Sequence, residues 1–369
     1  MCATGMWPGG EGMDMEQKSE PLDLLRAARA AGRKVAAIGG GTGLSTLLLG
    51  LKEYTDNITA IVTVTDDGGG SGVLRDEYGM LPPGDIRNCL LALANTSDAM
   101  NELLNYRFPD GSLKGQSFGN LFLLALNGVC GSFQTAVARM NDFLAVTGQV
   151  LPVTTSNVHL RAQFEDGSQV EGETAITRAK KQNNLVIQKI WLEPAGAQAL
   201  PEVIQAIDEA DLIILGPGSL YTSVIPNLLV DGVVQAIRRS KGLKIYILNI
   251  MTQDGETEGY TAADHLEALQ AHGGGQGLVD VCLYNTDRVA RRLLERYAGE
   301  SARQLWPDPA AFRKMGVELT GESILSRDAR FVRHDPLRLA YAVMKTAARL
   351  TPRQKVLQYY DELMLRQEG

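Results

Sequence analysis

The stretch "KVAAIGGGTGLSTLLLGLKEY", Lys34 to Tyr54, decides the fold. Its apolar run Val35 to Ile38 predicts a buried strand, and leucines recurring at the spacing of one helical face then predict an amphipathic helix. The glycine-rich turn between them leaves backbone N–H groups bare at a helix N-terminus, which suits phosphate or another anion. The stretch therefore predicts a phosphate-binding turn in an α/β fold, with a merely tight strand-to-helix turn as the alternative.

This turn matches neither of the two best-known glycine fingerprints. A Walker A loop needs Gly-Lys-Ser/Thr, but no lysine follows until Lys52. When the stretch is aligned to G-x-G-x-x-G from Gly41, the last position is Thr46. An ATP-hydrolysing P-loop is therefore not indicated.

The composition is that of an ordinary globular protein. The 369 residues are 44% hydrophobic and 21% charged, and the length allows one large domain or two modest ones. A net charge of −7 argues against a surface that coats nucleic acid. No apolar run reaches the roughly 18 residues of a membrane span, and the N-terminus lacks the features of a signal peptide. Four scattered cysteines without a C-x-x-C pair fit reduced thiols, so we expect a cytoplasmic protein.

Apolar strands and helical patterns alternate along most of the chain. After a second strand at 58–65, the pattern returns in "DLIILGPGSLYTS", "KIYILNIMTQDGET" and "LVDVCLYNTDR". Between these parts, "SNVHLRAQFEDGSQVEG" alternates apolar and polar residues, and Asp166-Gly167 supplies a turn. These patterns predict a Rossmann-like, doubly wound parallel sheet with a small antiparallel β insertion. We expect a flexible tail at 1–21, one domain at 22–345 with the insertion at 151–192, and a C-terminal helix at 346–369.

The loop "TDDGGGSG" after the second strand carries the adjacent acids Asp66 and Asp67. Such a pair suits Mg²⁺, or one acid suits a ribose hydroxyl. Asp66 lies 23 residues after Gly43, near the spacing of the ribose acid in a dinucleotide fold, which keeps NAD open as a ligand. A turn held by Asx hydrogen bonds is the plain alternative.

Further polar residues follow the other strands and open helices. Asp85 in "LPPGDIRN" is expected to cap the next helix, and Arg75 and Arg87 are candidates either for a phosphate or for solvated salt bridges. In "GPGSLYTS", a third glycine loop, Tyr221 suits stacking on a base or ordinary half-burial. The four histidines pair with no cysteine or serine motif, and neither a G-x-S-x-G elbow nor a zinc spacing occurs. The pattern favours a site for a phosphorylated, sugar-bearing nucleotide.

Seven motifs in order resemble those of the YvcK-like gluconeogenesis factors, relatives of the 2-phospho-L-lactate transferases of the CofD group. They are "GGGTGL", "VTVTDDGGGSG", "LPPGDIRN", "SFGNL", "GPGSLYTSVIPNLLV", "NIMTQDGETEGYTAADH" and "RHDP". The resemblance extends from about Lys34 to about Ala340. It implies a cytosolic Rossmann-like protein that binds a UDP-sugar such as UDP-N-acetylglucosamine. It also implies support of cell-wall synthesis and cell shape during gluconeogenic growth, with protein partners in cell-wall synthesis, and we expect a homo-oligomer.

Carried over by position, the resemblance also implies the site residues. The expected ligand contacts are Gly40, Gly41, Thr42, Gly43, Asp66, Asp67, Gly68, Asp85, Asn88, Asn120, Gly218, Ser219, Asn249, Thr252, Tyr260 and Arg296. If a metal binds, Asp66 and Asp67 are its expected ligands and Mg²⁺ the expected ion.

The acidic loop departs from the family pattern, which commonly reads Asp-Asp-Gly-Gly-Ser-Ser-Gly-Arg. Here Gly70 replaces a serine and Val73 the arginine, and Arg75 is the candidate to compensate. A nucleotide-sugar-binding regulator is the leading hypothesis, and a Mg²⁺-dependent transferase acting on a nucleotide diphosphate donor is its rival. An NAD-dependent oxidoreductase, which rests on the acid spacing alone, ranks last.

Overall fold

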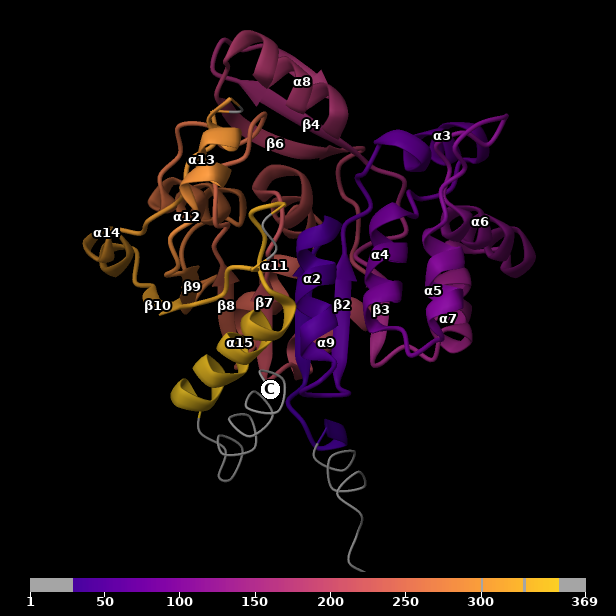
Figure 1. Ribbon diagram of the computed structural model, residues 1–369, viewed down its shortest axis with the longest axis horizontal. Coiled ribbons are helices and arrows are strands. Elements are labelled where there is room, and N and C mark those ends of the chain that lie inside the picture. The colour runs from indigo at the N-terminus through magenta and orange to yellow at the C-terminus, as the bar shows by residue number, and fades with distance from the viewer. Residues whose placement is uncertain (1–28, 300, 328–329, 352–369) are drawn as a thin grey trace, which may run out of the picture.

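A seven-stranded, fully parallel sheet forms the centre of the molecule (Figure 1). The computed structural model describes residues 29–299, 301–327 and 330–351. The sheet order is β10-β9-β8-β7-β1-β2-β3. The strands are β1 (Val35–Gly39), β2 (Ile58–Val62), β3 (Gln149–Pro152), β7 (Leu212–Leu215), β8 (Leu243–Ile247), β9 (Val281–Asn285) and β10 (Glu318–Glu322). The predicted Rossmann-like sheet is confirmed.

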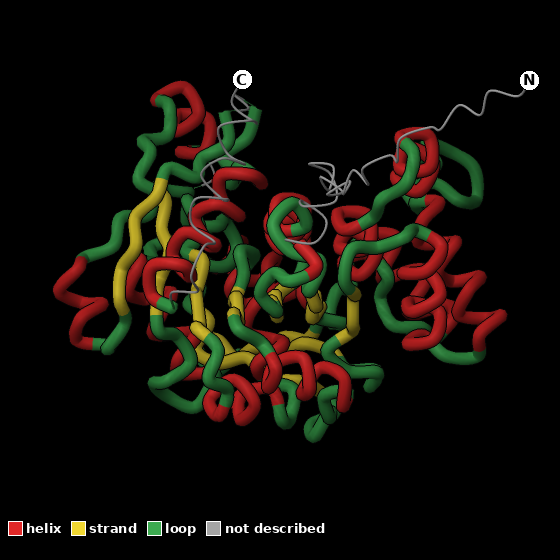
Figure 2. Tube along the Cα trace, turned by 90° about the horizontal axis from the view of Figure 1, so that it is seen from below, coloured by secondary structure: helices red, strands yellow, loops and turns green. Residues whose placement is uncertain are grey.

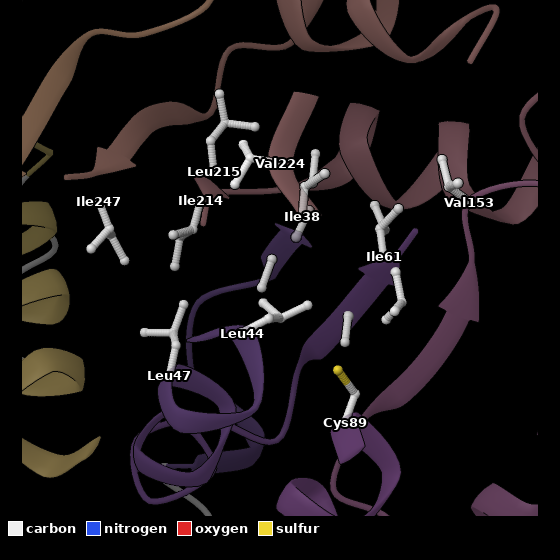
Figure 3. Packing of buried hydrophobic residues seen from close by; sticks show 14 of the residues in the cluster. Ile38, Leu44, Leu47, Ile61, Cys89, Val153, Ile214, Leu215, Val224 and Ile247 are labelled. Carbon is white, nitrogen blue, oxygen red and sulfur yellow. The ribbon is translucent and has the colours of Figure 1, made fainter. Parts of the chain in front are cut away.

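The central strands are buried on both faces, as their unbroken apolar sequences predict. Ile38 of β1 pairs with Ile61 of β2 on one side and with Leu215 of β7 on the other. Figure 3 shows these residues packed together, with Leu44 and Leu47 of the first helix beneath them. The leucine stripe of the opening stretch is therefore the face that this helix buries against the sheet.

Helices cover both faces of the sheet, which Figure 2 shows from below. On one face α2 (Gly41–Leu51) packs between α4 (Gly84–Leu93) and α15 (Pro336–Leu350). The other face carries α9 (Pro201–Glu209), α11 (Val233–Arg239) and, between them and β1, the π-helix η1 (Leu220–Val224) with α10 (Ile225–Leu228). Near the β10 edge lie α12 (Ala262–His272), α13 (Arg291–Ala298) and α14 (Pro309–Lys314).

A lobe of helices lies beyond the β3 edge and fills the connection from β2 to β3 (Figure 1). It contains α3 (Gly69–Tyr78), α5 (Asp98–Asn105), α6 (Phe118–Cys130) and α7 (Phe133–Phe143). Ser97, Ser117 and Ser132 cap the last three helices through their side chains. Within the described residues no single helix has the length and apolarity to cross a membrane. Only α6 and α7 taken together, across a bend of 119°, reach that composition.

The predicted antiparallel insertion is present, but it is smaller than expected and includes a helix. Its sheet has the order β5-β4-β6, from β4 (His159–Phe164), β5 (Gln169–Glu171) and β6 (Ile187–Glu193). Helix α8 (Glu173–Asn183) lies between β5 and β6. The predicted start at residue 151 is too early, because residues 149–152 form β3 and pair in parallel with β2.

The predicted segments at the two ends of the chain lie largely outside the described residues. The predicted tail at 1–21 lies outside the described residues, as do residues 352–369 of the predicted C-terminal helix. The last described helix, α15, begins at Pro336, ten residues before the predicted start. Asp335 sets this start, because its side chain accepts hydrogen bonds from the backbone N–H groups of Leu337 and Arg338.

Candidate functional site

The two central strands β1 and β7 mark the point at which the winding of the sheet reverses. After β1 the chain builds toward β3, and after β7 it builds toward β10. The loops that leave these two strands are "GGGTG" and "GPGS". Ligands of doubly wound sheets bind beyond the carboxyl ends of the strands at such a point. The antiparallel insertion lies over this same edge (Figure 1).

A cavity of about 550 Å³ opens at this edge. Its walls come from the loops after β1, β7 and β8, from α8 of the insertion, and from two segments near α13 and before α15. Eight of the sixteen predicted ligand residues line it: Gly40, Gly41, Thr42, Gly43, Gly218, Ser219, Asn249 and Thr252. A volume of this size is in the usual range for a small-molecule site.

The glycines of the first loop have different physical reasons to be glycine. Gly41 has φ of +63°, a left-handed conformation that favours glycine, and its missing Cβ would point into nearly open space. A Cβ on Gly43 would instead collide with the carbonyl oxygen of Pro217. Gly41 therefore keeps the cavity wall open, whereas Gly43 lets the two glycine loops pack against each other.

The N-terminus of α2 points its first N–H groups toward this cavity. The N-cap residue Gly40 supplies no side chain to satisfy them. One of them is taken from within the protein, because the carboxylate of Asp85 accepts a hydrogen bond from the N–H of Gly41. Asp85 was expected to cap its own helix, but α4 has no side-chain cap, and Asp85 bonds to the start of α2 instead.

Buried carboxylates gather behind the first loop. Burial and the nearby charge of Asp66 raise the pKa of Asp85 to about 6. Burial also raises the pKa of Asp66, although Asp66 accepts hydrogen bonds from the Gly68 N–H and from Ser71. The pKa of Glu173, at the start of α8, is raised well above its usual value by burial, with Asp66 adding to the effect. Burial therefore makes the ionisation of these carboxyl groups less favourable than it is in water.

The two adjacent acids point to different partners. Asp67 turns toward the insertion, where its Oδ1 accepts hydrogen bonds from the backbone N–H of Thr174 at 2.9 Å and from its hydroxyl at 2.8 Å. It thus caps α8, whereas Asp66 stays within its own loop. Among the described residues, no group of three or more His, Cys, Asp or Glu side chains is arranged to hold a metal ion. The predicted contact of Asp66 and Asp67 with a metal stays a prediction.

Both candidate arginines, Arg75 and Arg87, donate hydrogen bonds to other residues of this chain. Arg75 is buried, and its guanidinium donates to the side-chain oxygen of Asn157 and to the carbonyl of Val158, where the chain enters the insertion. Burial lowers its pKa. Arg75 does not line the cavity, so it does not replace there the cation that Val73 lacks.

Arg87 holds the first turn of α4 to the first turn of α6. It donates to Ser117 Oγ, to Asn120 Oδ1 at 3.1 Å and to Asn88 Oδ1 at 2.7 Å. The side-chain oxygens of Asn88 and Asn120 are therefore engaged with Arg87, and neither residue lines the cavity. Their predicted contacts with a ligand stay predictions.

Tyr260 and Arg296 lie outside the cavity wall. The Tyr260 hydroxyl is 2.7 Å from that of Tyr221, and the two rings meet edge to face. The Arg296 guanidinium lies 5.8 Å from the ring centroid of Tyr297, which does line the cavity, and 5.2 Å from that of Phe331. Arg296 is exposed, so its guanidinium borders the cavity mouth through Tyr297.

Several residues of the site were not predicted from the sequence. Lys181 reaches the cavity from α8, and its ammonium lies 2.5 Å from the Asp254 carboxylate. Glu256 is buried beneath η1, which follows the loop after β7, and it accepts a hydrogen bond from the Thr222 hydroxyl at 2.6 Å. Burial raises the pKa of Glu256 to about 7. Arg333 and His334 complete the wall, and burial lowers the pKa of His334 to about 4.

Comparisons with known proteins cover most of the chain. The family model of the 2-phospho-L-lactate transferase CofD matches residues 35–325. A protein of Thermoanaerobacterium thermosulfurigenes is 51% identical over 313 residues, which are 85% of this chain and 96% of that protein. The gluconeogenesis factor of Bacillus subtilis is 45% identical over 308 residues, covering 83% of this chain and 96% of that protein. A crystal structure of a UPF0052 family protein from Bacillus halodurans has a TM-score of 0.81 at 41% identity, covering 85% of this chain and 99% of that chain.

Proposed function

Since the chain belongs to the gluconeogenesis factor group of the CofD family, we propose that it is a regulatory protein that binds a nucleotide sugar. The proposed ligand is a UDP-sugar of the UDP-N-acetylglucosamine type. The observation that carries the proposal is the cavity at the switch point of the sheet, with the N-terminus of α2, whose N-cap residue Gly40 has no side chain, on one wall. In the cell, the bound state would support cell-wall synthesis and cell shape during gluconeogenic growth through protein partners.

The wall of the cavity supplies the two kinds of contact that such a ligand needs. The N–H groups of Thr42 and its neighbours at the start of α2 suit a diphosphate, because they carry the positive end of the helix dipole. Lys181 and Arg333 add cations at the rim. Ser219, Asn249 and Thr252 line the floor with hydroxyl and amide groups, which suit sugar and ribose hydroxyls.

A Mg²⁺-dependent transferase acting on a nucleotide diphosphate donor is the second candidate. The match to the CofD family model and the carboxylates behind the first loop favour it. Against it, Asp67 is engaged with Thr174, whereas Asp66 accepts its hydrogen bonds within its own loop, so the two acids do not point to one shared partner. Binding without turnover is therefore the better-supported reading.

Calorimetry on the full chain tests the proposal. UDP-N-acetylglucosamine, UDP-glucose, GDP and NAD are titrated in Mg²⁺ and in EDTA, and the ligand is recovered afterwards to detect its consumption. We expect a UDP-sugar to bind in both buffers and to be recovered intact. Asn249→Leu should weaken binding, because it removes an amide from the wall, while the matched change Asn105→Leu on exposed α5 should not.

Two other results would each overturn the proposal. Binding of NAD with no response to any UDP-sugar would restore the dinucleotide reading. Consumption of a nucleotide donor only in Mg²⁺ would establish the transferase instead.

A further inference from the structure

A cavity of about 570 Å³ lies at the carboxyl ends of β9 and β10. Its walls come from the loop after β9 and the start of α13, from the segment after β10, and from Arg338 of α15. Because β9 and β10 are adjacent parallel strands, both loops leave the sheet at the same edge (Figure 1). This cavity, which we call the arginine pocket, shares no lining residue with the cavity of the candidate site.

Positive charge dominates the described wall of the arginine pocket. Four arginines line it: Arg288, Arg292, Arg327 and Arg338. The one carboxylate in this wall, that of Asp287, accepts hydrogen bonds from the Ser323 hydroxyl at 2.9 Å and from the Leu325 N–H at 3.3 Å. Asp287 therefore joins the two loops, and the wall keeps a surplus of three positive charges.

Three of these arginines have no partner within the described parts of the chain. Arg288, Arg292 and Arg327 form neither an ion pair nor a side-chain hydrogen bond there, whereas neighbouring Arg291 pairs with Glu295 at 2.9 Å. All three are exposed, so their guanidinium groups are accessible to a ligand. Like charges held close together repel one another, and a bound anion would relieve this repulsion.

The N-terminus of α13 adds to the positive potential of the pocket. Its N-cap residue, Ala290, has no side-chain oxygen, and its first turn contains Arg291 and Arg292 but no acid. At this end of a helix the dipole favours acids and disfavours cations. The sequence thus breaks a rule of helix formation beside the pocket, and such departures are expected at functional sites. An anion would accept hydrogen bonds from the first N–H groups and neutralise the arginines.

We propose that the arginine pocket binds a small molecule with two phosphate groups, at a site separate from the proposed nucleotide-sugar cavity. Guanidinium groups suit phosphate, because their planar set of donors can bind two of its oxygens at once. A phosphate ester carries a charge of about −1.5 to −2 at pH 7, so two such groups balance the surplus of positive charge in the wall. The volume is in the range of small-molecule sites.

The charge distribution of the chain favours a small ligand over a long polyanion. Residues 288–338 contain eleven Lys and Arg against seven Asp and Glu, although the whole chain has a net charge of −7. The positive potential is therefore local, and the acidic remainder of the protein would repel a nucleic acid that extended beyond the pocket.

Calorimetric titration of the full chain with inorganic pyrophosphate, in buffer free of divalent cations, tests the proposal. Pyrophosphate is the probe because it carries two phosphate groups, and it should bind more tightly than sulfate at the same ionic strength. Arg292→Gln should raise its dissociation constant roughly tenfold or more, because a hydrogen bond to a charged group is lost. Arg313→Gln, at an exposed arginine of α14 outside the pocket, is the matched control and should leave the affinity unchanged.

Two further measurements separate this site from the first cavity and from a structural role. Gly41→Ala, which alters the wall of the first cavity, should keep the pyrophosphate binding that Arg292→Gln weakens. The ligand-free Arg292→Gln protein should melt no lower than wild type, because the substitution removes a cation from the N-terminus of α13. A lower melting temperature would mean that Arg292 serves the fold.

Three results would each overturn the proposal, whether or not the first cavity binds a UDP-sugar. The first is a wild type that does not bind pyrophosphate, or that binds it no better than sulfate. The second is an affinity that Arg292→Gln leaves unchanged. The third is binding that Gly41→Ala abolishes, since the phosphates would then lie at the N-terminus of α2.

Discussion

Replacing Asp85 by asparagine should make the ligand-free protein more stable at neutral pH. The carboxylate is buried behind α2, and burial together with Asp66 raises its pKa from 3.8 to about 6. Between these two pH values the folded protein holds a proton that the unfolded chain has released. Stability is therefore lost as the pH rises through this window, and the full penalty applies above about pH 6.

The size of the effect follows from the rise in pKa. A difference of about two pH units, at about 1.4 kcal/mol for each, corresponds to about 3 kcal/mol. Asparagine cannot ionise, and its amide oxygen can still accept the hydrogen bond from the Gly41 N–H. The free energy of unfolding of Asp85→Asn should therefore be about 1–3 kcal/mol higher than that of wild type at pH 7.5. This gain in stability should vanish near pH 4.

Differential scanning calorimetry of both proteins across this pH range measures the effect. The matched control is Asp142→Asn, at an exposed carboxylate of α7, which should leave the melting temperature unchanged. A variant that is no more stable than wild type at pH 7.5 would refute the reasoning. A gain of equal size at pH 4 would refute it as well, because the stabilisation could not then come from ionisation.

Two further predictions concern the loops that surround the cavity. Gly41→Ala should lower the stability by only about 1–2 kcal/mol, because the backbone at this position is left-handed, and it should abolish UDP-N-acetylglucosamine binding. Gly43→Ala should lower the melting temperature much more, because the added Cβ would collide with Pro217. Calorimetric titration with melting curves checks both variants, and equal melting temperatures would contradict this division of roles. Asp67→Ala should speed amide hydrogen exchange in α8 but not in β1, because it removes the acceptor for Thr174; unchanged exchange in α8 would mean that Asp67 does not hold the insertion.

The sheet and half of the predicted site residues could be predicted from the sequence because their signals are local. A buried parallel strand such as β1 is an unbroken apolar run, and the loop that follows it must lie at the carboxyl edge. Each predicted residue that lines the cavity lies in the segment that follows a strand or at the start of the helix after it, as Gly41 follows β1 and Asn249 follows β8. The topology rule for doubly wound sheets then brings these loops together.

The unpredicted residues reach the site through contacts between distant segments. Lys181 lies on a polar helix of the insertion, where its sequence resembles any solvated helical face. Glu256 follows "TQDG" in what reads as a polar loop, yet it is buried beneath η1. In each case burial depends on which remote element packs there, and local periodicity carries no information about that.

The acidic loop explains how the insertion is placed relative to the cavity. Asp67 of this loop caps α8, and Arg75 of the following helix, α3, bonds to the carbonyl of Val158, where the chain enters the insertion. The two residues that depart from the family pattern have different surroundings. Val73 is exposed, and a Cβ on Gly70 would lie 2.6 Å from the side-chain oxygen of Gln116.

Helix α8 is therefore held to the core at its N-terminus by Asp67. Toward its C-terminus, buried Lys180 pairs with Glu258 at 2.8 Å, and its neighbour Lys181 lines the cavity. Because a helix is rigid, a shift of its N-terminus also shifts its C-terminus. The position of Asp67 in the acidic loop therefore affects where the Lys181 ammonium lies. On this argument, Asp67 acts on a ligand through the helix that it holds, and its effect on affinity should depend on Lys181.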